Sequence, residues 1–338
     1  MARVTLGHGS GGELTRRLIH DVFLKHLPDP ELGRLGDAAV LPREGLPGGG
    51  SLAFTTDSYV ITPLEFPGGD IGHLAVCGTV NDLAAAGAQP LWLTAGWILE
   101  EGLPLDLLER QVASLAATAE AAGVRVVAGD TKVVPHGLAD GLYINTAGLG
   151  WVPPGRLLRR ESVQPGDAIL VSGTLGDHGM AVMLARQGMR LQTNLVSDAA
   201  PLNELVERLF AAGVPVHWLR DATRGGLGGV LCELAETRPY GVRVEATALP
   251  VRPEVEAAAE LLGLDPLFVA NEGKMVAVVP GDQAEAALTA WRAHPHGTQA
   301  AQVGVITEER PGQVLLRTAY GGARVLRLPA GELLPRIC

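Results

Sequence analysis

The chain has 338 residues, of which 47% are hydrophobic and 19% charged, which is a globular composition with enough length for two domains. Its net charge of −10 argues against a nucleic-acid-binding surface. Three widely spaced cysteines are neither a disulfide framework nor a CxxC metal site. The sequence has no secretory signal and no apolar stretch of the roughly 20 residues that span a membrane, so we expect a cytoplasmic protein.

The first half of the chain alternates predicted helices and strands. After a glycine-rich loop at Gly7–Gly12, an amphipathic helix is expected over 13–27, with a buried face formed by Leu14, Leu18, Val22 and Phe23. The elements that follow are a strand at 51–57, a helix at 70–88 capped by Asp70, a strand at 89–99, a helix at 103–123, a buried strand at 124–130 and a strand at 141–152.

The composition changes to Pro, Gly and Arg over 152–167, where we place a domain boundary. The second half is predicted to hold strands at 168–173, 242–247 and 275–280, a loop at 220–229, and helices at 177–187, 200–213, 230–236, 254–263 and 282–293. The segment 322–338 begins as a strand and continues as a tail. The pattern predicts an α+β protein with domains at 1–152 and 153–325 and a mobile tail at 326–338.

The three cysteines have different settings. Cys77 and Cys232 lie in apolar helical patterns and are predicted to be core thiols. Cys338 is the last residue of "GELLPRIC", where order is usually lowest, so it cannot fill a core. It is either incidental or carried on a segment built to move, with Leu333, Leu334 and Ile337 as apolar anchors. The terminal carboxylate disfavours the thiolate and Arg336 partly offsets it, so we expect a near-ordinary thiol.

The glycine-rich loop comprises His8, Gly9, Ser10, Gly11 and Gly12, preceded by Gly7. It matches GxGxxG literally, but no good strand precedes it, so we reject a dinucleotide-binding fold. Its backbone N–H groups could cradle phosphate oxygens. A disordered N-terminal arm is an equally good interpretation of this motif alone.

Four aspartates in the first half suggest a metal–nucleotide site. Asp57 and Asp130 each end an apolar strand, Asp37 follows a glycine, and Asp82 lies among alanines in a helix. Mg²⁺ prefers several hard carboxylate oxygens. The alternative is that Gly-Asp pairs mark turns, but it is weak for Asp82, because an aspartate in an apolar helix needs a partner.

Other polar residues are candidates for binding or catalysis. Lys132 follows Asp130 by two residues and could contact phosphate or a developing oxyanion, or form a surface ion pair. Asp221, Thr223 and Arg224 precede a glycine run that leads into a helix, which suits an anion site. Glu272 lies at a loop-to-strand junction and is a candidate base or an ordinary exposed glutamate.

Seven motifs in this order resemble the PurM-like ATP-binding superfamily, which includes aminoimidazole ribonucleotide synthetase, selenophosphate synthetase and thiamine-monophosphate kinase. They are "GHGSGG", "GDAAV", "TTDSYV", "VNDLAAAGAQP", "GDTKVV", "DATRGGLGG" and "ANEGKM". With the terminal "PRIC", the chain is similar to the HypE family of carbamoyl dehydratases, which make cyanide for [NiFe] hydrogenases.

The resemblance implies a two-domain PurM-like fold and a homodimer joined through the N-terminal domains. It also implies ATP and Mg²⁺ held by Asp37, Asp57, Asp82 and Asp130, with 8–12 as the phosphate loop. Lys132 and Glu272 would meet the tail. Cys338 would receive a carbamoyl group from HypF, and ATP-dependent dehydration would give a thiocyanate whose cyanide passes to the iron-carrying HypC–HypD complex.

Two other functions are compatible with the motifs. One is a sister enzyme acting on a free small molecule, such as selenophosphate synthetase, which would not use a terminal thiol. The other is a non-catalytic ATP-sensing scaffold whose tail is a docking peptide.

Overall fold

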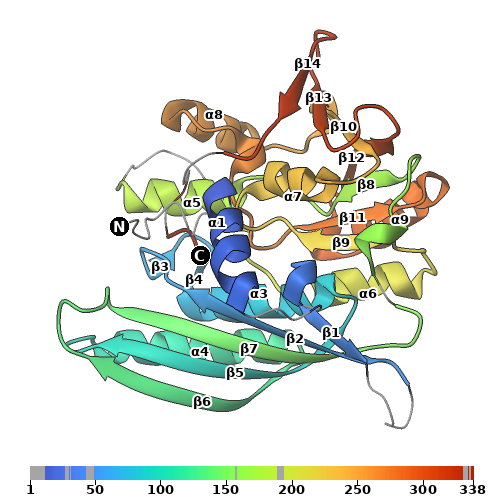
Figure 1. Ribbon diagram of the computed structural model, residues 1–338. Coiled ribbons are helices and arrows are strands. Elements are labelled where there is room, and N and C mark those ends of the chain that lie inside the picture. The colour runs from blue at the N-terminus through green and yellow to red at the C-terminus, as the bar shows by residue number, and fades with distance from the viewer. Residues whose placement is uncertain are drawn as a thin grey trace.

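The computed structural model describes residues 12–26, 30, 32–42, 49–156, 158–188, 194–329, 334 and 336–338. Two large β-sheets dominate these residues, one from each half of the chain, and helices pack between and around them (Figure 1). Each sheet is built around strands with buried aliphatic side chains. None of the described helices is long and apolar enough to cross a bilayer.

The N-terminal sheet has the strand order β1-β2-β7-β5-β6. Its neighbours are antiparallel except β5 and β6, which are parallel and connected through helix α4 (Leu105–Ala121). The strands are β1 (Ala39–Pro42), β2 (Ser51–Tyr59), β5 (Gln89–Glu100), β6 (Arg125–Val134) and β7 (Leu142–Val152). A small hairpin of β3 (Glu65–Phe66) and β4 (Gly69–Asp70) precedes helix α3.

Helix α3 (Ile71–Ala85) lies between the two sheets (Figure 1). The Asp70 side chain caps it by accepting a hydrogen bond from the His73 N–H at 2.8 Å, as predicted. Small residues let it approach the sheet closely, since a Cβ at Gly148 of β7 would lie 2.6 Å from Thr79 Cγ2. On its other side, Asn81 donates to the carbonyls of Ala200 and Glu272, at 3.1 and 3.2 Å. The helix therefore fixes the site residues of one half relative to the other.

The C-terminal sheet has the strand order β14-β13-β10-β12-β8-β11-β9. Its two faces pack against different helices, α7 on one side and α6 with α9 on the other. The strands are β8 (Ala168–Val171), β9 (Trp218–Asp221), β10 (Gly241–Glu245), β11 (Met275–Val279), β12 (Ala301–Thr307), β13 (Val314–Arg317) and β14 (Ala323–Leu326). The helices are α5 (Asp177–Arg186), α6 (Asn203–Ala211), α7 (Gly226–Ala235), α8 (Pro253–Leu262) and α9 (Ala284–Arg292).

Two predictions of burial were wrong for this chain. The segment expected as one helix consists of α1 (Glu13–Leu18), a π-helical turn (Ile19–Phe23) and α2 (Leu24–His26), and Val22 and Phe23 of its predicted buried face are about half exposed. Strand β6 is exposed along almost its whole length, because it lies at the edge of its sheet. The thiol prediction was better: Cys77 is fully buried, and Cys232 is partly buried against the C-terminal core.

Candidate active site

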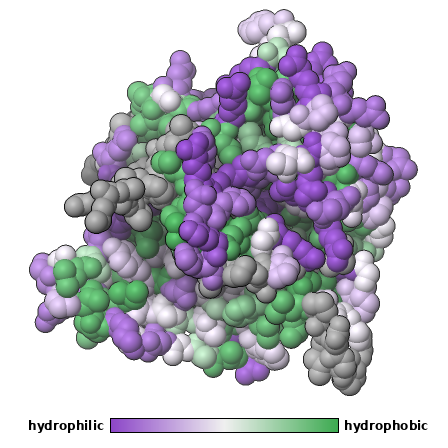
Figure 2. Space-filling model, viewed as in Figure 1, coloured by the Kyte–Doolittle hydropathy of each residue, from purple (hydrophilic) through white to green (hydrophobic). Residues whose placement is uncertain are grey.

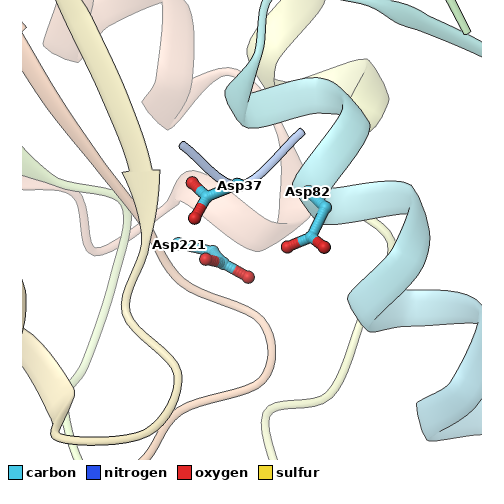
Figure 3. Close-up of side chains that lie close together, drawn as sticks. All are labelled: Asp37, Asp82 and Asp221. Carbon is cyan, nitrogen blue, oxygen red and sulfur yellow. The ribbon is translucent and has the colours of Figure 1, made fainter. Parts of the chain in front are cut away.

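Three aspartates from different parts of the chain converge on one point (Figure 3). Asp37 precedes β1, Asp82 lies on α3 and Asp221 ends β9, and one carboxylate oxygen from each lies within 4.8 Å of the others. The N-terminal half contributes two of these side chains and the C-terminal half one. Clustered carboxylate oxygens are the ligands that a hard divalent cation prefers.

The cluster concentrates negative charge in a poorly hydrated place. Burial raises the pKa of Asp82 well above its usual range, and the neighbouring aspartates raise it further. Burial likewise raises the pKa of Asp221 to about 6, although Arg220 partly opposes this. Arg220 Nε lies 2.8 Å from Asp37 Oδ1, and Thr55 donates its hydroxyl proton to Asp82 Oδ2 at 2.7 Å. These contacts orient the carboxylates, but the acidic side chains still outnumber the basic ones at this point, which favours the binding of a cation.

Asp57, on β2, lies beside this cluster. Its Oδ2 accepts a hydrogen bond from the Tyr59 hydroxyl at 3.1 Å. Burial raises the Asp57 pKa, and the Asp57 charge in turn raises the pKa values of Asp82 and Asp221. Three of the four aspartates predicted to hold metal and nucleotide are therefore neighbours.

The end of the chain also reaches this region. An oxygen of the Cys338 terminal carboxylate accepts a hydrogen bond from the Val60 N–H at 3.1 Å, one residue beyond β2. Ile337 is 2% exposed and packs in the core cluster that lies between the two halves, with Leu334 against it. The predicted anchoring role is confirmed for these two side chains, whereas Leu333 lies outside the described residues.

The docked thiol is not the near-ordinary one expected from the sequence. Burial raises the pKa of Cys338 to about 12. Arg224 opposes this rise, but the charges of Glu272, Asp57 and Asp221 add to it. The expectation of an ordinary thiol pKa was based on two sequence neighbours, the terminal carboxylate and Arg336. It failed because the fold brings other acids to the thiol.

Glu272 is buried beside the thiol, not exposed. Its side-chain Oε1 has no hydrogen-bond partner among the residues that the structure describes, and the residue is 3% exposed. Its backbone N–H donates to Asp198 Oδ1 at 3.1 Å, and Lys274 Nζ lies 2.8 Å from the other oxygen of Asp198. Burial raises the Glu272 pKa well above its usual range, and Asp221, Asp198 and Asp57 raise it further. Glu272 is thus held by its backbone while one carboxyl oxygen remains available.

Asp130 and Lys132 do not join this group within the chain. They form an ion pair of 2.9 Å on the edge strand β6, with both side chains about 70% exposed. The Lys132 hydrogen bond lowers the Asp130 pKa, the opposite of the shift in the buried cluster. Of the glycine loop, His8, Gly9, Ser10 and Gly11 lie outside the described residues, and Gly12 precedes α1 as its N-cap.

Asp221 was grouped with Arg224 in a predicted anion site, not with the metal-binding acids. Its place at the end of a strand was the missed signal, because the short strand β9, "WLRD", was taken as the start of a loop. Arg224 does lie near the site: the charge of Cys338 is the largest cause of its raised pKa, ahead of Asp57 and Glu272.

Family models and curated relatives assign the chain to the same family. Family models described as AIR synthase related protein, N-terminal and C-terminal domains, match residues 35–152 and 164–317, which confirms the predicted two-domain α+β PurM-like fold. The carbamoyl dehydratase HypE of Rhodobacter capsulatus is 52% identical over 99% of this chain and 98% of its own length.

Two solved structures are similar over most of the chain. One, described as hydrogenase maturation protein HypE in complex with ATP, is 48% identical with a TM-score of 0.82, covering 99% of this chain and 100% of the other. The second, a HypE–HypF complex, gives 44% identity and a TM-score of 0.86, covering 92% and 99%. The chain therefore belongs to the carbamoyl dehydratase HypE family of AIR synthase related proteins.

Proposed function

We propose that this protein dehydrates a carbamoyl group on its own Cys338 to a thiocyanate at the expense of ATP, and so supplies cyanide for [NiFe]-hydrogenase assembly. The observation that carries the proposal is the docking of the terminal thiol beside Glu272, Arg224 and the aspartate cluster. A fold that brings the last residue of the chain to a buried acid cluster suits a tethered substrate, since tethering gives a high effective concentration.

The reaction balances without an oxidant or reductant. The carbonyl oxygen of S–C(=O)–NH₂ attacks the γ-phosphorus of ATP and ADP leaves. The C–O bond then breaks, phosphate departs with that oxygen, and the two amide protons are lost, leaving S–C≡N. Phosphorylation turns a poor leaving group into a good one.

The side chains near the thiol divide the work. Glu272 is the general base for the amide protons, because its raised pKa makes its ionised form a stronger base than an ordinary glutamate. Arg224 offsets the negative charge that gathers there. Asp37, Asp82 and Asp221, with Asp57 beside them, fit Mg²⁺, which would neutralise phosphate charge when bound.

Lys132 and Asp130 are proposed to act from the second copy of a homodimer. They lie on the exposed edge strand β6 with an apolar surface around them, so a partner chain packed there would bring them toward a neighbouring site. Lys132 would then lie near the carbonyl oxygen. The glycine loop 8–12 is proposed to cover the phosphates.

The proposed partners follow the family. HypF, which is found with HypE in a solved complex, would donate the carbamoyl group, and the HypC–HypD complex would receive the cyanide. We propose a cytoplasmic protein with domains at 1–152 and 153–325, and a tail at 326–338 that leaves its docked position to meet these partners.

Mass spectrometry tests the function. Chain carbamoylated on Cys338 and given ATP and Mg²⁺ should lose the mass of one water molecule, and Cys338→Ala should neither accept the carbamoyl group nor change mass. A carbamoylated chain that binds ATP without losing this mass would contradict the proposal and favour the scaffold. Carbamoyl label and cyanide from Cys338→Ala would exclude Cys338 as the carrier.

A further inference from the structure

The backbone of the docked tail is bound at the main-chain oxygens of three successive residues, two carbonyls and the terminal carboxylate. Arg186 Nη2 donates to the carbonyl oxygen of Arg336 at 2.6 Å, and His178 Nε2 lies 2.7 Å from that of Ile337. An oxygen of the Cys338 carboxylate accepts from the Val60 N–H. The two side chains come from α5, and the N–H comes from the segment after β2. The last three residues are thus held between the two halves of the chain.

The hydrogen bonds of His178 assign its tautomer. Because a carbonyl oxygen only accepts, the proton must be on Nε2, and Nδ1 accepts from the Ser197 hydroxyl at 2.7 Å. The Ser197 oxygen in turn accepts from the Ala199 N–H at 3.1 Å. Burial lowers the His178 pKa, which favours this neutral form. The ring is therefore fixed as a donor aimed at the tail.

Arg186 binds both the tail and the segment after β2. Its Nε donates to the carbonyl oxygen of Thr62 at 2.9 Å while its Nη2 binds Arg336. Thr62 N–H also donates to the Arg336 carbonyl oxygen, at 3.4 Å. His178 and Arg186 are eight residues apart on α5, so they lie along one face of the helix.

Gly179 on the same helix leaves room for the apolar part of the tail. A Cβ at this position would lie 3.2 Å from Leu334 Cδ1 and 2.5 Å from Val269 Cγ1. The helix thus offers the tail two directed donors and a smooth surface between them. Because these donors bind main-chain oxygens, they set which residue lies where, whatever its side chain.

We propose that His178 and Arg186 are positioning residues that fix the register of the docked tail and thereby set the Cys338 sulfur, with its substituent, beside Glu272. The hydrogen bonds that carry this role go to main-chain oxygens of the tail, so both residues act on the sulfur through the backbone. The catalytic consequence rests on the proposed function, but the holding of the tail does not. One residue added after Cys338 would move the sulfur away from Glu272 while leaving all three donors occupied.

The first test measures docking without the reaction. Iodoacetamide alkylates Cys338 at pH 8, and mass spectrometry of the C-terminal peptide follows the reaction. The alkylation rate reports the fraction of molecules in which the thiol is undocked. Arg186→Gln and His178→Ala should each raise the alkylation rate about tenfold or more. Arg186→Gln removes a charged donor and His178→Ala a buried one, and each leaves a tail carbonyl oxygen without that hydrogen bond. His178→Gln retains an N–H donor and should restore much of the protection.

The matched control is Arg292→Gln on α9. Arg292 also donates to a backbone carbonyl, that of Ala300 at 2.8 and 3.0 Å, but far from the tail. Its alkylation rate should equal that of the wild type. If His178→Ala does not fold, as judged by its thermal unfolding, Arg186→Gln decides, since Arg186 is only half-buried.

The second test measures the consequence in the carbamoylated full chain. Single-turnover dehydration should slow about tenfold in Arg186→Gln with ATP affinity unchanged, as expected from a lost positioning contact. The proposal is overturned if either the alkylation rate or the dehydration rate of Arg186→Gln matches the wild type. If the wild-type chain itself forms no thiocyanate, the proposed function fails, and the alkylation rates alone decide whether these residues hold the tail.

Discussion

At the scale of single residues, the main feature is a group of acids whose pKa values are raised by burial and by one another. Asp37, Asp82 and Asp221 face one point, and Glu272 lies near the thiol of Cys338. Folded proteins rarely bury several carboxyl groups together without a functional reason, because desolvation of each costs free energy. The arrangement agrees with the proposed binding of a cation together with the phosphates of ATP.

Asp82→Asn should abolish most ATP turnover. The asparagine keeps the shape of the side chain but removes one charge from the cluster, so we expect a loss of about 100-fold or more in rate. ATP hydrolysis measured against Mg²⁺ concentration would reveal the loss. Asp106→Asn, on the exposed face of α4, is the control. If Asp82→Asn hydrolyses ATP as fast as Asp106→Asn, Asp82 is excluded from the metal site.

Glu272→Gln should separate carbamoylation from dehydration. The amide fills the same space but cannot accept a proton, so the variant should take the carbamoyl group on Cys338 and stop before the thiocyanate. The wild-type rate should rise with pH as Glu272 ionises, and the small residual rate of the variant should lack that rise. Dehydration at the wild-type rate in Glu272→Gln would remove this residue from the mechanism.

The thiol of Cys338 gives a pH dependence of docking. Its docked pKa is raised to about 12, so the docked form retains a proton that the undocked thiol loses at lower pH. Docking is therefore fully favoured below the ordinary thiol pKa and weakens as pH rises above it. Tail protection, measured as the alkylation rate relative to the unfolded chain, should fall between about pH 8 and pH 10. Protection that increases over this interval would contradict the raised pKa.

At the scale of elements, α3 connects the fold to the site. It carries Asp82 toward the cluster, and Asn81 binds backbone groups of the other half. Its cap was predictable, because Asp70 precedes an apolar run in the usual way. Most of the longer helices and strands were predicted for the same reason, but the seven-residue strand β12 was missed. The four-residue strands β9 and β13 were missed too, whereas β8, of the same length, was predicted because all four of its residues are aliphatic.

Asp70→Ala should destabilise the protein by about 1 kcal/mol, because the His73 N–H at the start of α3 loses its acceptor. Urea unfolding should show the change in midpoint. Glu109→Ala, on the exposed surface of α4, should leave the midpoint nearly unchanged. Equal midpoints for Asp70→Ala and the wild type would show that the cap contributes nothing.

At the scale of the whole molecule, the N-terminal sheet leaves apolar side chains on the surface. Figure 2 shows hydrophobic residues over this sheet, and Phe54, Trp92, Val127 and Val133 are each more than 40% exposed. Such a surface around an unpaired edge strand indicates an interface between chains. The prediction that 124–130 is buried would then hold in a dimer, although it is wrong in the single chain.

We expect light scattering to give a dimer mass for the wild type. Val127→Asp, in β6, should shift the mass toward the monomer, because it puts a charge into the apolar contact. Leu261→Asp, on α8, changes an equally exposed apolar residue elsewhere and should remain dimeric. A wild-type monomer at working concentration would contradict the homodimer.

The candidate site was only partly predictable, because part of it depends on how the two halves of the chain pack together. The sequence suggested Asp37, Asp57 and Asp82 individually, since each lies beside an apolar segment. It could not show that Asp221 would complete the cluster, because this depends on how two sheets pack around α3. It also could not show that the tail folds back against α5, since its last residues contact segments more than 100 positions away.

The docked tail has a consequence for the durability of the enzyme. Peroxide oxidises the thiolate form of cysteine, first to a sulfenic acid and then to irreversible products. Because the docked thiol of Cys338 has a raised pKa, we expect peroxide to oxidise it more slowly than the undocked thiol. Docking of the tail would therefore also protect the Cys338 thiol from oxidation before the proposed reaction.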